Sequence, residues 1–161
     1  MPASAAALEE ILALLCEEEH ALCSLITLAL EEQDALVDSD FDSVATISAG
    51  MLDAAGSIEA LEENRLILLR TFGAEDLTLE ELLPLADDLG VRGFAEARLR
   101  LGAKAQELRD AQEQNARLLL NAMKLRDRWA NLLGGYIAPG YSRDGGRQSA
   151  ADTRGTVSRS A

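Results

Sequence analysis

Residues 8–37, LEEILALLCEEEHALCSLITLALEEQDALV, decide the fold of this chain. Within them Leu8, Leu15, Leu22, Ala29 and Leu36 recur every seven residues. The first 64 residues contain fifteen Asp or Glu and no Lys or Arg. A sustained seven-residue apolar repeat in an acidic, leucine-rich segment is typical of a long helix that packs against other helices. The stretch favours a helical binding protein over an enzyme.

Over the whole chain, the apolar spacing predicts three long helices and one short helix. Capping and glycine signals place them at about 5–37, 41 to 71 or 72, near 78 to 90, and 93–133, with Gly134-Gly135 ending the last one. Pro84 is expected to kink or shorten the third helix. The expected fold is all-α, an elongated antiparallel helical bundle or coiled coil. We expect residues 1–141 to form the helical domain, and residues 142–161, rich in Arg, Gly and Ser, to form a disordered tail.

The second helix carries an apolar stripe at three-and-four spacing, and Gly50 and Gly56 lie inside this helix. Each glycine costs about 1 kcal/mol relative to Ala, so we expect close helix approach to offset that cost. The stripe comprises Val44, Ile47, Met51, Ala54, Ile58, Leu61, Arg65, Leu68 and Phe72.

The net charge of −13 is unevenly distributed. Residues 1–133 carry 11 basic and 26 acidic residues, a net −15, whereas the remainder carries four Arg and two Asp, a net +2. An acidic body repels nucleic acid and anionic lipid. The most apolar run, residues 21–30, is half the length of a membrane span. We therefore expect a cytoplasmic protein with neither a nucleic-acid partner nor a membrane span.

Catalytic signals are few. His20 is the only histidine, so Glu17-Glu18-Glu19-His20 cannot complete a di-iron site, which requires two Glu-x-x-His motifs. Cys16 and Cys23 lie about 10 Å apart along one helix, too far apart for a disulfide, and have no basic neighbour in sequence. No phosphate-binding loop or activated nucleophile is present in the sequence. We expect no enzyme activity, metal or cofactor.

Two polar residues interrupt the apolar stripes. Arg65 is either a charge inside the bundle, paired with Glu62 or with an acid from another helix, or a surface residue where the register drifts. Asn115 interrupts the last helix in the same way. A buried Asn commonly fixes the register of a helical bundle, and we prefer this structural role to a ligand role.

The stretch most suggestive of function runs from Leu118 to Tyr141. Apolar residues occupy more than one face of this helix, so one neighbour cannot cover them all. Such a surface can capture a partner helix, although the same residues can instead close the bundle core. The candidate binding residues are Leu118, Leu119, Ala122, Leu125, Trp129, Leu132 and Leu133.

The order of these elements resembles the FlgN-type flagellar export chaperones over about residues 8–145. The resemblance rests on the acidic first helix and on Asp38-Ser39-Asp40-Phe41 opening the second. It also rests on Leu61-Glu62-Glu63-Asn64-Arg65-Leu66-Ile67-Leu68-Leu69, Asn115-Ala116-Arg117-Leu118-Leu119 and Tyr141-Ser142-Arg143-Asp144-Gly145. The sequence departs from that family at Gly50-Met51, where a Lys is common.

The resemblance implies a cytoplasmic, non-enzymatic chaperone of type III flagellar export. Its clients would be hook-associated proteins 1 and 3, the hook-filament junction proteins, held by their disordered C-terminal segments on the last helix. Tyr136 or Tyr141 would dock on the export gate protein. The expected state is a monomer or weak dimer. The alternatives are a coiled-coil scaffold without a client and, as a third class, a helix-bundle metalloenzyme.

Overall fold

The structure is a computed structural model that describes residues 4–137, except the side chains of Trp129 and of residues 135–137. It divides into two compact units, residues 1–118 and 119–161, which we describe separately. The described residues form four helices and no strand, which confirms the all-α prediction. The predicted domain boundary at residue 141 and the predicted tail lie outside the described residues.

Helix α1 (Ala5–Val37) begins at Ser4, whose hydroxyl accepts a hydrogen bond from the amide of Ala7. Ser39, at φ 57°, turns the chain, and Asp40 then caps α2 (Phe41–Thr71) by accepting from the amide and the hydroxyl of Ser43. Gly73 follows α2 at φ 66°, the left-handed conformation that glycine adopts without strain. The bounds of both helices match the prediction.

Helix α3 (Leu79–Asp88) starts with a capping box that the sequence analysis overlooked. Thr78 accepts from the amide of Glu81, and the Glu81 carboxylate accepts from the amide of Thr78. Hydrogen bonding of the Glu81 carboxylate, first to the backbone amide of Thr78 and then to the Thr78 side chain, lowers the pKa of Glu81. Pro84 does not end α3, because the helix continues to Asp88.

Helix α4 (Phe94–Ile137) is longer than predicted. Gly134-Gly135 was expected to stop it after Leu133, but the helix passes through both glycines. Gly134 is exposed and a Cβ built there would meet no atom within 4 Å. An exposed helical glycine therefore weakens a helix without ending it, unless the backbone turns into the left-handed region.

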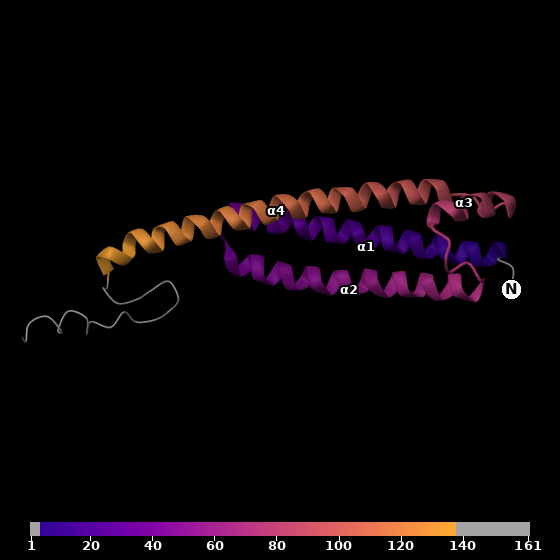
Figure 1. Ribbon diagram of the computed structural model, residues 1–161, viewed down its shortest axis with the longest axis horizontal. Helices are drawn as coiled ribbons and strands as arrows, with labels where there is room; N and C mark the ends of the chain where they lie inside the picture. The colour runs from indigo at the N-terminus through magenta and orange to yellow at the C-terminus, as the bar shows by residue number, and fades with distance from the viewer. Residues whose placement is uncertain (1–3, 138–161) are drawn as a thin grey trace, which may run out of the picture. The chain divides into compact units, whose positions relative to one another are not determined.

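In the first unit α1 lies between α2 and the first part of α4, with α3 near the start of α1 (Figure 1). The core lies at that end. It joins α1, α2, α3, α4 and the loops between them through Leu8, Ile11, Leu15, Leu69, Ala74, Leu82, Ala86, Val91, Phe94 and Ala97. The residues of the predicted seven-residue repeat lie on the side of α1 that packs against the other helices. Leu8, Leu15, Ala29 and Leu36 are buried, and Leu22 is half-buried.

Helix α2 packs less deeply than α1. Every residue of its predicted stripe is half-buried, and Leu69 is the only fully buried residue of the helix. The expected close approach at Gly50 and Gly56 is wrong, because a Cβ at either position would meet nothing within 4 Å. By length and composition α2 also passes as a candidate membrane span, with a mean hydropathy of 1.2 and none of that window buried.

Candidate functional site

An ion pair joins α1 and α2 in the middle of the first unit. Arg65 Nε lies 2.9 Å from Glu18 Oε1, and the two side chains are 14% and 10% exposed. A second, exposed carboxylate, that of Glu62, lies 3.8 Å from Arg65 Nη2. Of the two alternatives for Arg65, the structure supports the charge inside the bundle, and its main partner is on another helix.

Asn115 connects α4 to α1. Its Nδ2 donates to the carbonyl of Ala29 at 2.7 Å and to Glu32 Oε1 at 3.1 Å, while Ser48 of α2 donates to Glu32 Oε2 at 2.8 Å. Asn115 is 3% exposed, and its Oδ1 has no hydrogen-bond partner within the part of the chain that the structure describes. The Glu32 carboxylate of α1 thus binds both α2 and α4. Only one register of α4 on α1 brings Asn115 to this carboxylate and to the Ala29 carbonyl.

Basic residues in the first part of α4 make ion pairs with the neighbouring helices. Arg100 Nε lies 3.0 Å from Glu19 of α1, and Arg98 Nη2 lies 3.1 Å from Glu80 of α3. The hydrogen bond to Glu19 is the main cause that raises the pKa of Arg100.

The only histidine makes a local contact. His20 Nδ1 lies 3.0 Å from the carbonyl oxygen of Cys16, one turn earlier on the same exposed helix face. Among the described residues no group of three or more His, Cys, Asp or Glu side chains could hold a metal ion.

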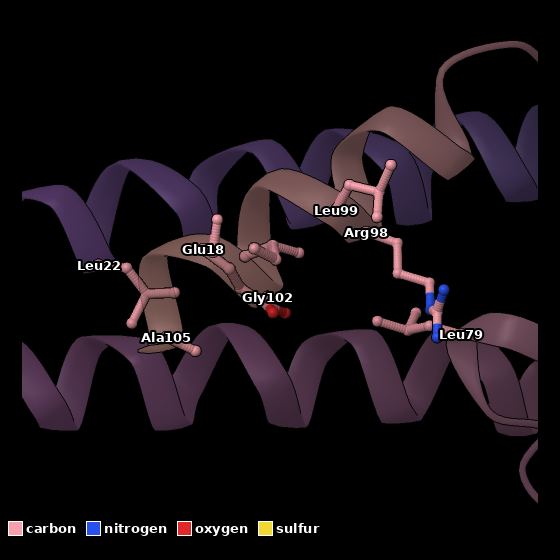
Figure 2. A pocket seen from close by; sticks show the side chains of 9 residues that line it. Glu18, Leu22, Leu79, Arg98, Leu99, Gly102 and Ala105 are labelled. Carbon is pink, nitrogen blue, oxygen red and sulfur yellow. The ribbon is translucent and has the colours of Figure 1, made fainter. Parts of the chain in front are cut away.

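A shallow hollow of about 570 Å³ lies between α1, α3 and α4 of the first unit (Figure 2). Its surface is mostly apolar, with Glu18 on the α1 side and Arg98 beside Leu79 of α3. The hollow could not be predicted from the sequence, because its residues are far apart in the chain and include small residues of α4. The lining residues are Glu18, Leu22, Leu79, Arg98, Leu99, Leu101, Gly102, Ala103 and Ala105.

The second unit consists, as far as it is described, of residues 119–137 of α4. Four of its predicted binding residues are exposed: Leu119 by 39%, Leu125 by 55%, Leu132 by 55% and Leu133 by 44%. Ala122 is half-buried, and so is Leu118, the last residue of the first unit.

The remaining predicted site residues lie partly or wholly outside the described part of the chain. Trp129 and Tyr136 lie in α4, but their side chains are outside the described part, and Tyr141 is outside it entirely. Two exposed residues were missing from the predicted set, Leu120 at 52% and Met123 at 44%. The available signals were the run Leu118-Leu119-Leu120 and, for Met123, its position four residues after Leu119 on the same side of a helix.

Basic residues accompany this apolar surface. Residues 119–137 carry Lys124, Arg126 and Arg128 against Asp127, a net +2 in a chain of net −13. Arg126 and Asp127 form a loose pair, 3.8 Å apart. An apolar helix with a basic surround can attract a partner that combines apolar and acidic side chains.

Fold and surface together define an all-helical bundle protein with several large apolar side chains exposed along residues 119–133 of α4. A family model described as "FlgN: FlgN protein" matches residues 1–149. The chain belongs to the FlgN family, whose members are chaperones of flagellar assembly in type III protein export. Membership implies binding of flagellar hook-associated proteins. No curated protein and no solved structure matched the chain.

Proposed function

We propose that this protein holds the C-terminal segments of hook-associated proteins 1 and 3 on the helix of its second unit. The observation that carries the proposal is the exposure of Leu119, Leu125, Leu132 and Leu133 along one helix. Exposed leucines in such number are costly in water and mark a surface that a partner covers. Ala122 and Trp129 belong to the same predicted set.

The chemistry of this surface suits a disordered client that folds as it binds. An amphipathic client helix would place its leucines on the α4 leucines and its acids near Lys124, Arg126 and Arg128. Ordering the client costs several kcal/mol of the gross interaction energy, which keeps affinity moderate and permits release at the export gate. Covering the client's apolar face would prevent its premature assembly.

Delivery needs a second contact, and we propose Tyr136 or Tyr141 as the residue that docks on the export gate protein. A tyrosine offers a large apolar ring and one hydroxyl, a combination frequent at protein interfaces. We propose a cytoplasmic, non-enzymatic protein, a monomer or weak dimer that binds no nucleic acid and spans no membrane. Helix α2 would remain on α1, where the buried ion pair of Arg65 with Glu18 holds it.

The test compares two matched variants in a calorimetric titration with the C-terminal segment of a hook-associated protein from the same source. Leu125→Asp places a charge on the proposed surface, and the expected result is at least a tenfold loss of affinity. Leu52→Asp is the control, because Leu52 lies on α2 and is 76% exposed. It should leave affinity unchanged. Equal affinities of both variants would refute the site, and no binding by the unmodified protein would favour a scaffold without a client.

A further inference from the structure

The first unit has an apolar groove of about 430 Å³ between α1 and α2, which we call the α1–α2 groove. Ile67 is 50% exposed there, and Leu14 and Leu68 are half-buried. These apolar side chains remain in contact with water within the described chain, as expected of a surface that a partner covers. The lining residues are Glu10, Ala13, Leu14, Asn64, Ile67 and Leu68.

The surroundings of the α1–α2 groove are acidic. Residues 5–71, which contain both helices, carry fifteen Asp or Glu and two Arg, a net −13. Glu10 lines the groove, and Glu17 follows it on the same side of α1 after two helical turns; both are exposed. Of the two Arg, Arg65 is paired inside the bundle, and Arg70 lies in the last turn of α2. A segment that fits this groove therefore combines apolar and basic side chains.

The helix of the second unit has this combination. At about 100° per residue, its exposed apolar side chains lie on one continuous arc around α4. Lys124 and Arg128 lie beside the two edges of the arc, Arg126 lies within it, and residues 119–137 carry a net +2. The arc residues are Leu119, Leu120, Met123, Leu125, Leu132 and Leu133.

We propose that, in the free protein, the helix of the second unit of one copy docks in the α1–α2 groove of a second copy. Its leucines would contact Leu14 and Ile67, and its basic side chains would lie near Glu10 and Glu17. This inference rests on the proposed function, because the docked helix is the one that binds the client. It adds a form of regulation, in which the second copy covers the client-binding surface until a client displaces it.

Charge selects the α1–α2 groove over the other surfaces that two copies could use. Arg98 lines the hollow between α1, α3 and α4, and Arg100 and Lys104 belong to the same stretch of α4, so this hollow suits a basic helix less well. Two helices of the second unit facing one another would bring like charges together. The described lining of the α1–α2 groove, by contrast, includes a carboxylate and neither Lys nor Arg.

The experiment is sedimentation equilibrium of the full chain over a range of concentrations, at low and at high salt. The expected result is self-association that weakens as salt rises, because exposed charges are screened. Ile67→Gln in the groove and Leu125→Gln in the helix should each weaken self-association at least tenfold. Leu52→Gln, on α2 at 76% exposure, is the matched control and should leave it unchanged. Glu10→Lys, a second groove variant at an exposed position, should also weaken it.

A mixture of the two variants tests whether the contact joins unlike surfaces. Ile67→Gln retains an intact helix and Leu125→Gln retains an intact groove, so an equimolar mixture should associate where each variant alone does not. Adding the C-terminal segment of a hook-associated protein should dissociate the unmodified protein into client-bound single copies. Ile67→Gln should bind that segment at least as tightly as the unmodified protein, because no second copy competes.

The possible failures are distinguishable. A single copy at every concentration, or self-association that Leu125→Gln weakens and both groove variants leave intact, would overturn the docking proposal and leave the proposed function standing. Failure of the mixture to associate would overturn it as well. Self-association that a bound client leaves unchanged would overturn the competition. If the client segment bound none of these proteins, the proposed function itself would fail, and the regulation with it.

Discussion

Arg65 of α2 and Glu18 of α1, 47 positions apart in sequence, are joined by a 2.9 Å hydrogen bond within the first unit. Both side chains are at least 85% shielded, at 14% and 10% exposure. The pair is therefore largely removed from water. Loss of one partner would leave the charge of the other buried and uncompensated.

The first prediction follows from that burial. Arg65→Met should lower the free energy of unfolding by about 3 kcal/mol, because Glu18 remains buried without its partner. Glu62→Gln should change it by less than about 0.5 kcal/mol, since that carboxylate is exposed. The double variant Glu18→Leu, Arg65→Met should recover most of the loss. Urea unfolding measures all three, and equal losses for the two single variants would contradict the assignment.

The second prediction concerns the carboxamide of Asn115. Asn115→Asp would bury a carboxylate beside Glu32, so stability at pH 7 should fall by more than about 2 kcal/mol. Burial and Glu32 would raise the pKa of the new carboxyl in the folded protein, so the penalty should shrink as the pH falls and that carboxyl is protonated. Gln114→Asp, on the exposed neighbour, is the control. Thermal unfolding at pH 7 and pH 5 measures the loss of stability of each variant. A loss for Asn115→Asp that did not depend on pH would argue against a buried site beside Glu32.

The third prediction uses the capping box of α3. The hydrogen bonds from Thr78 hold the pKa of Glu81 below its usual range, so the folded state favours the ionised carboxylate. The ionised Glu81 carboxylate therefore contributes to the free energy of unfolding. This contribution is fully present above the pKa of Glu in the unfolded chain, about 4.3, and is lost as the pH falls through the lower pKa of the folded protein. Glu81→Gln should therefore flatten the acid side of the stability profile, whereas Glu75→Gln should not. Superimposable profiles for the original protein and Glu81→Gln would contradict the prediction.

The fourth prediction distinguishes a helical Gly134 from a terminal one. Because α4 continues through Gly134 with open space where a Cβ would stand, Gly134→Ala should increase helix content and stabilise this segment by up to about 1 kcal/mol. A glycine ending the helix in the left-handed conformation would give the opposite sign. Circular dichroism of the two proteins at equal concentration decides between them.

Much of the fold followed from local signals. Ser4, Asp40 and Gly73 act on residues within a few positions, so their roles were predictable from sequence. The same logic misplaced the end of α4, because Gly134-Gly135 stops a helix only if the backbone adopts a positive φ. The capping box at Thr78 and Glu81 was present in the sequence and simply overlooked.

Features that depend on distant residues were less accessible. The choice of Glu18 as the partner of Arg65, and of Ala29 and Glu32 as the partners of Asn115, depends on how the helices pack. The same holds for the hollow between α1, α3 and α4. The exposed surface of the second unit was predictable in outline, because apolar residues on several faces of one helix exceed what one neighbour covers.

The most direct test of the central claim is a calorimetric titration of the full chain with the C-terminal segment of hook-associated protein 1 or 3 at several temperatures. The proposal predicts saturable 1:1 binding with a negative heat-capacity change, the mark of apolar burial on coupled folding. No saturable heat with either segment, or binding with a heat-capacity change near zero, would contradict client capture on the helix of the second unit.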